Sequence, residues 1–63
     1  MTNLKKMRES RGLTQTELAI KSEVNMRTIQ NYEQGKANIN KGAVITILKL
    51  SRALDCSMLD IME

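Results

Sequence analysis

The sequence predicts an all-α fold built from five short helices, with no strands. Apolar residues recur at three- and four-residue intervals, which is the spacing of one face of a helix. Polar residues suited to helix N-caps and three glycines separate these segments, and the chain contains no proline. With 63 residues, the chain is expected to form a single domain over residues 1–63 around one small core.

The first expected helix covers residues 3–11 and stops at Gly12. The second helix begins after Thr14 and runs to about Ser22. Thr14 and Glu17 have the spacing of a capping box, in which each side chain accepts a hydrogen bond from the other residue's backbone N–H.

Asn25 is a good N-cap for a third helix, which is expected to end near Glu33 or Gln34, before Gly35. Residues 36–40, with the sequence KANIN, are expected to form a loop. Asn40 is the candidate N-cap of the fourth helix.

The segment GAVITILKLSRAL is rich in β-branched residues, so propensity alone allows a strand. A helix is preferred because an isolated strand would have nothing to pair with, and because a stripe recurs at helical spacing. The residues of this expected buried stripe are Val44, Ile47, Leu50, Ser51 and Leu54. Ser57 is expected to cap a last short turn.

The charge is unevenly distributed along the chain. Residues 1–54 hold ten lysines and arginines against four glutamates, whereas the last nine residues hold three acidic side chains. A basic body favours a polyanionic partner, although a solvated lysine surface explains the same composition equally well.

Several classes of function and site are close to excluded. The lone cysteine, Cys56, rules out an internal disulfide, and the absence of histidine leaves too few ligands for a zinc site. No nucleophile–base pair or phosphate-binding glycine loop is present, so an enzyme is not expected. No signal core or membrane span is evident, which predicts a cytoplasmic protein with no membrane partner. We expect no cofactor, no metal and no small-molecule ligand.

The third helix carries hydrogen-bonding side chains on its outer face. Arg27 and Asn31 lie almost opposite Ile29 and Tyr32, with Gln30 beside them. Arginine can bond to O6 and N7 of guanine, and asparagine or glutamine to N6 and N7 of adenine. Any solvated helix can carry such residues, and composition alone favours that interpretation.

Glu33 is expected to point inward, on the same side of the third helix as Ile29. A buried carboxylate is costly without a cationic partner, and Arg8 in the first helix is the candidate. The alternative is that Glu33 bends out to water and pairs with nothing.

The stretch MRESRGLTQTELAIKSEVNMRTIQNYEQGK resembles the helix-turn-helix core of the Cro/cI-type (lambda-repressor-like, XRE-type) DNA-binding proteins. Their pattern is an Arg, then Gly-Leu-Thr-Gln-x-Glu-Leu-Ala, a turn, and Ile-x-x-Tyr-Glu-x-Gly-Lys. The chain supplies Arg8, Gly12, Leu13, Thr14, Gln15, Glu17, Leu18, Ala19, Val24, Ile29, Tyr32, Glu33, Gly35 and Lys36. The segment ILKLSRALDCSMLDI is similar to the family's closing two helices. The resemblance covers nearly the whole chain and places the helix-turn-helix at about residues 14–34.

The resemblance implies sequence-specific binding to double-stranded DNA, with the third helix in the major groove. By position in the family pattern, the base-contacting residues would be Met26, Arg27, Gln30 and Asn31. The phosphate-contacting residues would be Gln15, Asn25, Lys36, Asn38 and Lys41. Met26 could contact a thymine methyl or simply pack over the start of the helix. Arg8 and Glu33 correspond to a pair that forms an internal salt bridge in related repressors.

The chain departs from the family pattern at the turn, where Glu23 stands in place of the usual glycine. If the backbone is left-handed there, the β-carbon costs about 1 kcal/mol relative to glycine.

One such motif spans only a few base pairs, so tight binding calls for a homodimer on a pseudo-palindromic operator. Apolar residues outside the expected core are the candidates for the dimer contact: Ile45, Leu48, Leu59 and Met62. A monomer with an apolar surface is the alternative. The sequence thus predicts a transcriptional regulator, specifically a repressor. The competing interpretation is an antitoxin or adaptor that uses the same fold to bind a protein.

Overall fold

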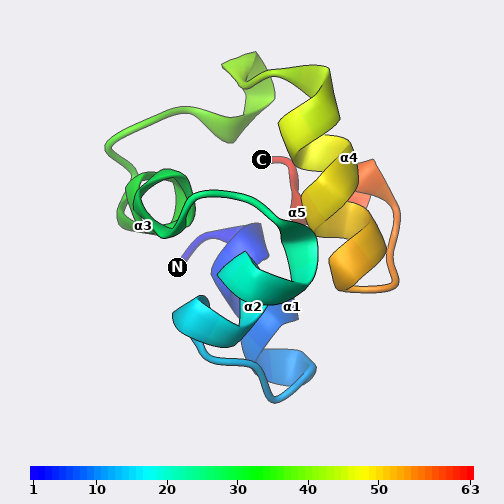
Figure 1. The fold of residues 1–63 in the computed structure, drawn as a ribbon. Helices are drawn as coiled ribbons and strands as arrows, with labels where there is room; N and C mark the ends of the chain where they lie inside the picture. Colours follow the sequence, from blue (N-terminus) through cyan, green and yellow to red (C-terminus); the bar gives the residue numbers. More distant parts are fainter.

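The computed structural model describes all of residues 1–63 and contains five α-helices, one short 3₁₀ helix and no strands. The elements are α1 (Asn3–Ser10), α2 (Gln15–Ser22), α3 (Met26–Gln34), η1 (Ile39–Lys41), α4 (Val44–Ala53) and α5 (Met58–Ile61). The predicted all-α fold of five helices is confirmed. Figure 1 shows α3 end-on at one side of the molecule and α4 at the opposite side, with α2 between them. None of the helices combines the length and the apolar composition that crossing a membrane requires.

Helix α2 lies between α3 and α4 (Figure 1) and packs against both. The first and last helices contact each other, since α5 packs against α1 as well as α4. Eleven buried apolar side chains form the core, and Leu18, Ile29 and Leu50 are completely enclosed in it. Tyr32, the one aromatic residue, is also buried there.

Reciprocal caps fix the starts of α2 and α5. The backbone N–H of Glu17 donates to Thr14 Oγ1 at 3.0 Å, and that of Thr14 donates to Glu17 Oε1 at 2.8 Å. The bond from the Thr14 N–H, followed by that from the Thr14 side chain, favours the ionised carboxylate and therefore lowers the pKa of Glu17. Ser57 and Asp60 form an equivalent box at α5, where the Ser57 N–H donates to Asp60 Oδ2 at 3.0 Å.

The expectation that Asn40 caps the fourth helix is wrong. Helix α4 begins after Ala43, whose side chain offers no cap. The loop instead contains η1, which Asn38 caps by accepting the Asn40 N–H at 2.9 Å. The side chain of Asn40 is therefore left to bond elsewhere in the fold.

The expectation that Val44 is buried is also wrong, because its side chain is 68% exposed. On a helix with 100° per residue, the arc occupied by Ile47, Leu50 and Leu54 is centred about a quarter turn from Val44. Ser51 is buried as predicted, and its hydroxyl donates to the carbonyl of Leu48 at 2.8 Å. The inward face of α4 is consequently rotated away from Val44 and toward Ala53, which is also buried.

One residue on each side of α3 has an unusual backbone requirement: Glu23 before the helix and Gly42 after it. Glu23, between α2 and α3, adopts the left-handed conformation (φ 58°, ψ 31°) at the position where related proteins favour glycine. Beyond α3, Gly42 faces Tyr32: a β-carbon at Gly42 would meet the Tyr32 hydroxyl and lie 3.1 Å from its Cζ and 3.2 Å from the Ile39 carbonyl oxygen. The ring of Tyr32 thus fits against the connection to α4 only because residue 42 has no side chain.

Candidate nucleic-acid interface

Helix α3 presents two chemically different faces. Ile29 and Tyr32 are buried, whereas Arg27 is exposed and Gln30 and Asn31 are half-buried on the other side. No hydrogen bond within the chain engages the side chains of Arg27, Gln30 and Asn31, and the single ion pair of the protein lies elsewhere. Their donors and acceptors are therefore available to an external partner.

The turn before α3 holds this outer face in place. The Ser22 hydroxyl donates to the Leu18 carbonyl at 2.7 Å and accepts the Val24 N–H at 3.3 Å. Asn25 Oδ1 then accepts the N–H of Arg27 at 2.8 Å, which caps α3. The amide nitrogen of exposed Asn25 remains free beside the start of the helix.

Met26 lies at the edge of the outer face and is 40% exposed. Its sulfur is 3.4 Å from the hydroxyl of Thr16 on α2. The side chain thus packs against the first turn of α2 and still offers apolar surface outward.

Arg8 and Glu33 form a buried ion pair between α1 and α3. Arg8 Nε donates to Glu33 Oε2 at 2.7 Å and Nη2 donates to Oε1 at 3.0 Å, with only 10% of the arginine and 2% of the glutamate side chain exposed. Arg8 Nη1 also donates to the Leu13 carbonyl at 2.7 Å. The hydrogen bonds to Glu33 raise the pKa of Arg8, although burial opposes this effect.

Gln15 joins this pair, which the sequence did not indicate. Its Nε2 donates to Glu33 Oε1 at 3.0 Å, so one carboxylate links α1, α2 and α3. An amide nitrogen has two hydrogens, and the bond to Glu33 uses one of them. Gln15 is half-buried at the start of α2, with its remaining donor and acceptor unengaged.

The loop after α3 carries Lys36, Asn38 and Lys41, all of which are exposed. Neither lysine forms an ion pair within the chain, because the one ion pair is that of Arg8 and Glu33. The side chain of Asn38 also caps η1. The loop therefore carries two free cations, Lys36 just after α3 and Lys41 in η1.

Asn40 contacts the C-terminal segment, another feature that the sequence did not indicate. Asn40 Nδ2 donates to the Glu63 carbonyl and the Glu63 N–H donates to Asn40 Oδ1, both at 2.8 Å. The partners are 23 residues apart, so no local spacing could have predicted the contact.

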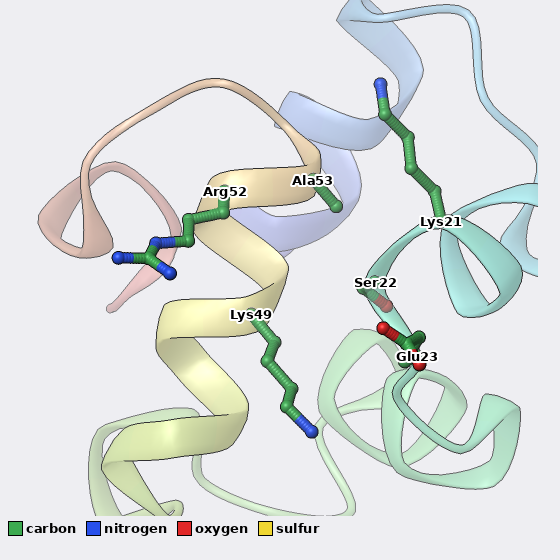
Figure 2. Close-up of a pocket in the computed structure, with 6 residues that line it drawn as sticks. All are labelled: Lys21, Ser22, Glu23, Lys49, Arg52 and Ala53. Carbon is green, nitrogen blue, oxygen red and sulfur yellow. The ribbon is translucent and has the colours of Figure 1, made fainter.

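A shallow hollow between α2 and α4 is rich in cationic residues. It is lined by Lys21, Ser22, Glu23, Lys49, Arg52 and Ala53. Figure 2 shows the charged ends of Lys21, Lys49 and Arg52 pointing away from one another. They form a broad basic surface and do not converge on a single anion.

The residues considered for a dimer contact differ in exposure. Ile45 on α4 is 59% exposed and Leu59 on α5 is 79% exposed. Leu48 and Met62 are half-buried, and Met62 also packs against the core.

The comparison with protein families agrees with the geometry of α2 and α3. The helix-turn-helix family model matches residues 4–61, which is nearly the whole chain. Searches of curated proteins and of solved structures gave no match. A capped helix, a tight turn and a second helix with a free polar face are the structural elements of this motif. The chain belongs to the helix-turn-helix family and is a DNA-binding transcriptional regulator of the Cro/cI type.

Proposed function

We propose that the protein is a repressor that binds a pseudo-palindromic operator as a homodimer. Helix α3 enters the major groove, and Met26, Arg27, Gln30 and Asn31 contact the bases. The observation that carries this proposal is the free outer face of α3. Its polar side chains have no partner in the chain, whereas the opposite face is fixed in the core by Ile29.

Contacts to the DNA backbone would come from both sides of α3. Gln15 and Asn25 lie before or at the start of the helix, and each keeps an amide donor free beside its internal hydrogen bond. Lys36, Asn38 and Lys41 follow the helix. Such contacts set the register on the duplex and make the affinity depend on salt, while the α3 side chains select the sequence.

The dimer contact would use the apolar surface of α4 and α5, centred on Ile45 and Leu59. Burial of such surface is the main driving force for association. A two-fold dimer places its two α3 helices in successive major grooves, about 34 Å apart. A dimer bound over a promoter represses by blocking access to that DNA.

Selection from a random duplex library tests the base readout. The wild type should enrich an inverted repeat, and an Arg27→Ala/Asn31→Ala variant should lose it while keeping weak, salt-sensitive binding. Arg52→Ala is the matched control, because it removes an exposed arginine from α4 and leaves α3 intact. An identical consensus from the wild type and the double variant would reject readout by α3. A wild type that enriches no sequence would redirect the search to a protein partner.

Sedimentation tests the dimer separately from DNA binding. Ile45→Glu and Leu59→Glu should each shift the protein toward monomer, since an interface cannot bury an unpaired carboxylate without cost. Ile20→Glu is the control, because Ile20 is similarly exposed but lies on α2 and not on the apolar surface of α4 and α5. A wild type that remains monomeric at high micromolar concentration would reject the dimer.

A further inference from the structure

The C-terminal segment is held between the first helix and the loop that follows α3. On one side, Asn3 Nδ2 donates to the Met62 carbonyl at 2.8 Å, and the Asn3 N–H donates to Glu63 Oε1 at 3.0 Å. On the other side, Asn40 and Glu63 exchange their two hydrogen bonds of 2.8 Å. We call the four residues Asn3, Asn40, Met62 and Glu63 the C-terminal clasp. Figure 1 shows the C-terminus inside the arc formed by α3, η1 and α4.

Asn40 is the member of the clasp that belongs to the loop. It lies in η1, between the capping residue Asn38 and the free cation Lys41. Its side-chain oxygen and nitrogen both bond to Glu63, so the residue offers little to DNA directly. The neighbouring Ile39 anchors η1 in the core, with 4% of its surface exposed. Ile39 thus gives η1 one apolar anchor, and the paired bonds of Asn40 supply a second fixed point.

We propose that Asn40 is a positioning residue for DNA binding. Through the C-terminal clasp, the backbone of Glu63 fixes the orientation of η1 and thereby directs Asn38 and Lys41 toward the phosphates. This inference rests on the proposed contact between the loop and the DNA backbone. It assigns a role in DNA binding to residue 63, which is distant in sequence from the helix-turn-helix.

Two substitutions at residue 63 isolate the clasp without altering the loop. Glu63→Ala removes the carboxylate and keeps the N–H that donates to Asn40. Glu63→Pro removes the same carboxylate and also this N–H. Met62 already has φ −79° and ψ 158°, which is the conformation that a residue before proline prefers. Because both variants lose the same charge, any difference between them reports on the hydrogen bond to Asn40.

The measurement is operator affinity in the full chain, over a range of salt concentrations and at a temperature where each variant is folded by circular dichroism. Glu63→Pro should bind about fivefold more weakly than Glu63→Ala, the loss expected for one hydrogen bond. Asn40→Ala should show a similar or larger loss. Asn3→Ala opens the opposite side of the clasp and should weaken binding less. Equal affinities for Glu63→Pro and Glu63→Ala would overturn the inference, as would equal losses for Asn40→Ala and Asn3→Ala.

Lys41→Ala separates a failure of this inference from a failure of the proposed function. In the wild type it should lower the salt slope by about 0.9, the value for one phosphate contact on duplex DNA. In the Glu63→Pro background the reduction should be much smaller, because the displaced loop no longer presents the lysine. A general loss of stability would not change this slope. An unchanged slope in the wild-type background would reject the phosphate contact itself. A full reduction in both backgrounds would reject the clasp alone.

Discussion

The two connections that flank α3 are built in different ways. The turn between α2 and α3 is short, and its hydrogen bonds join near neighbours: Ser22 bonds to Leu18 and Val24, and Asn25 caps the helix that follows it. The connection from α3 to α4 depends on Gly42 facing Tyr32, and on a C-terminal residue that bonds to Asn40. The first connection is determined locally, and the second by distant parts of the chain.

The two connections therefore control two different properties of the surface: the orientation of α3 and the position of the loop that follows it. The local turn sets the angle between α2 and α3, which the motif needs in order to place a helix in a groove. The long connection sets where the loop lies relative to that helix. Substitutions in the two connections should therefore have distinct effects on stability and on DNA binding.

The largest expected effect comes from the ion pair, which holds α3 independently of either connection. Arg8→Met should lower the free energy of unfolding by about 3 kcal/mol, because the Glu33 carboxylate would be left buried with Gln15 as its remaining partner. Urea denaturation measures this loss. The double variant Arg8→Met/Glu33→Met should recover most of it, since an apolar pair can replace a buried ion pair. A single variant as stable as the wild type would show that the pair contributes nothing.

Gly42→Ala should break the long connection at a cost of about 2 kcal/mol, typical of overpacking in a filled site. The added methyl group would collide with the hydroxyl of Tyr32 and crowd the Ile39 carbonyl. Thermal denaturation would report the loss. Tyr32→Phe should relieve part of it in the double variant, because the hydroxyl is the nearest atom.

Gly35→Ala is the matched control for Gly42→Ala. A β-carbon at Gly35 would have no atom within 4 Å, but its φ of +77° disfavours a side chain. The cost there should be about 1 kcal/mol from the backbone alone. Tyr32→Phe should not restore stability to Gly35→Ala. Restoration there would mean that the effect at Gly42 is not steric.

Glu23→Gly should stabilise the protein by about 1 kcal/mol, because it relieves the left-handed conformation in the local turn. Operator affinity should not change, since the turn keeps its geometry. Asp55→Gly tests the same effect away from α3, because Asp55 has φ 53°. Equal or lower stability of Glu23→Gly in urea would contradict this explanation.

The smallest expected effect is a pH dependence at the cap of α2. The hydrogen bonds from Thr14 lower the folded-state pKa of Glu17, so the unfolded chain binds this proton more readily. The resulting stability is fully present above the unfolded pKa and is lost as the pH falls through the folded pKa. Glu17→Gln should therefore be less stable than the wild type at neutral pH, and the difference should shrink in acid. A constant difference across urea titrations would exclude this linkage.

Short-range patterns predicted the helices well. The capping box of Thr14 and Glu17, the Asn25 cap and the glycine after α3 all involve residues a few positions apart, and all are present. The wrong expectation that Asn40 caps the fourth helix arises from a contact between residues far apart in the sequence. Asparagine caps a helix by bonding to the backbone of near neighbours, but the side-chain amide of Asn40 bonds instead to the backbone of Glu63. The residues next to Asn40 in the sequence do not indicate this contact with Glu63.

In the candidate site, too, the sequence predicts features that depend on local periodicity but not those that depend on how the helices pack. The sequence could identify which α3 side chains lie opposite Ile29, because helical periodicity alone places them. It could not reveal that Gln15 bonds to Glu33, since that contact depends on how α2 packs on α3. The exposure of Val44 likewise depends on the rotation of α4 in the fold, which the spacing of apolar residues does not determine within a quarter turn.

The buried ion pair also determines the charge that α3 would present to DNA in the proposed complex. Helix α3 carries one acidic and one basic residue, Glu33 and Arg27, and taken alone it is neutral. Arg8 compensates the glutamate from behind, within the interior, while Arg27 faces outward without a counter-ion. In the proposed complex, the DNA therefore meets the unopposed charge of Arg27 and little of the repulsion that a free carboxylate would exert. By neutralising Glu33 from the core side, α1 gives α3, the helix proposed to read the bases, a net positive field without adding any group to its outer surface.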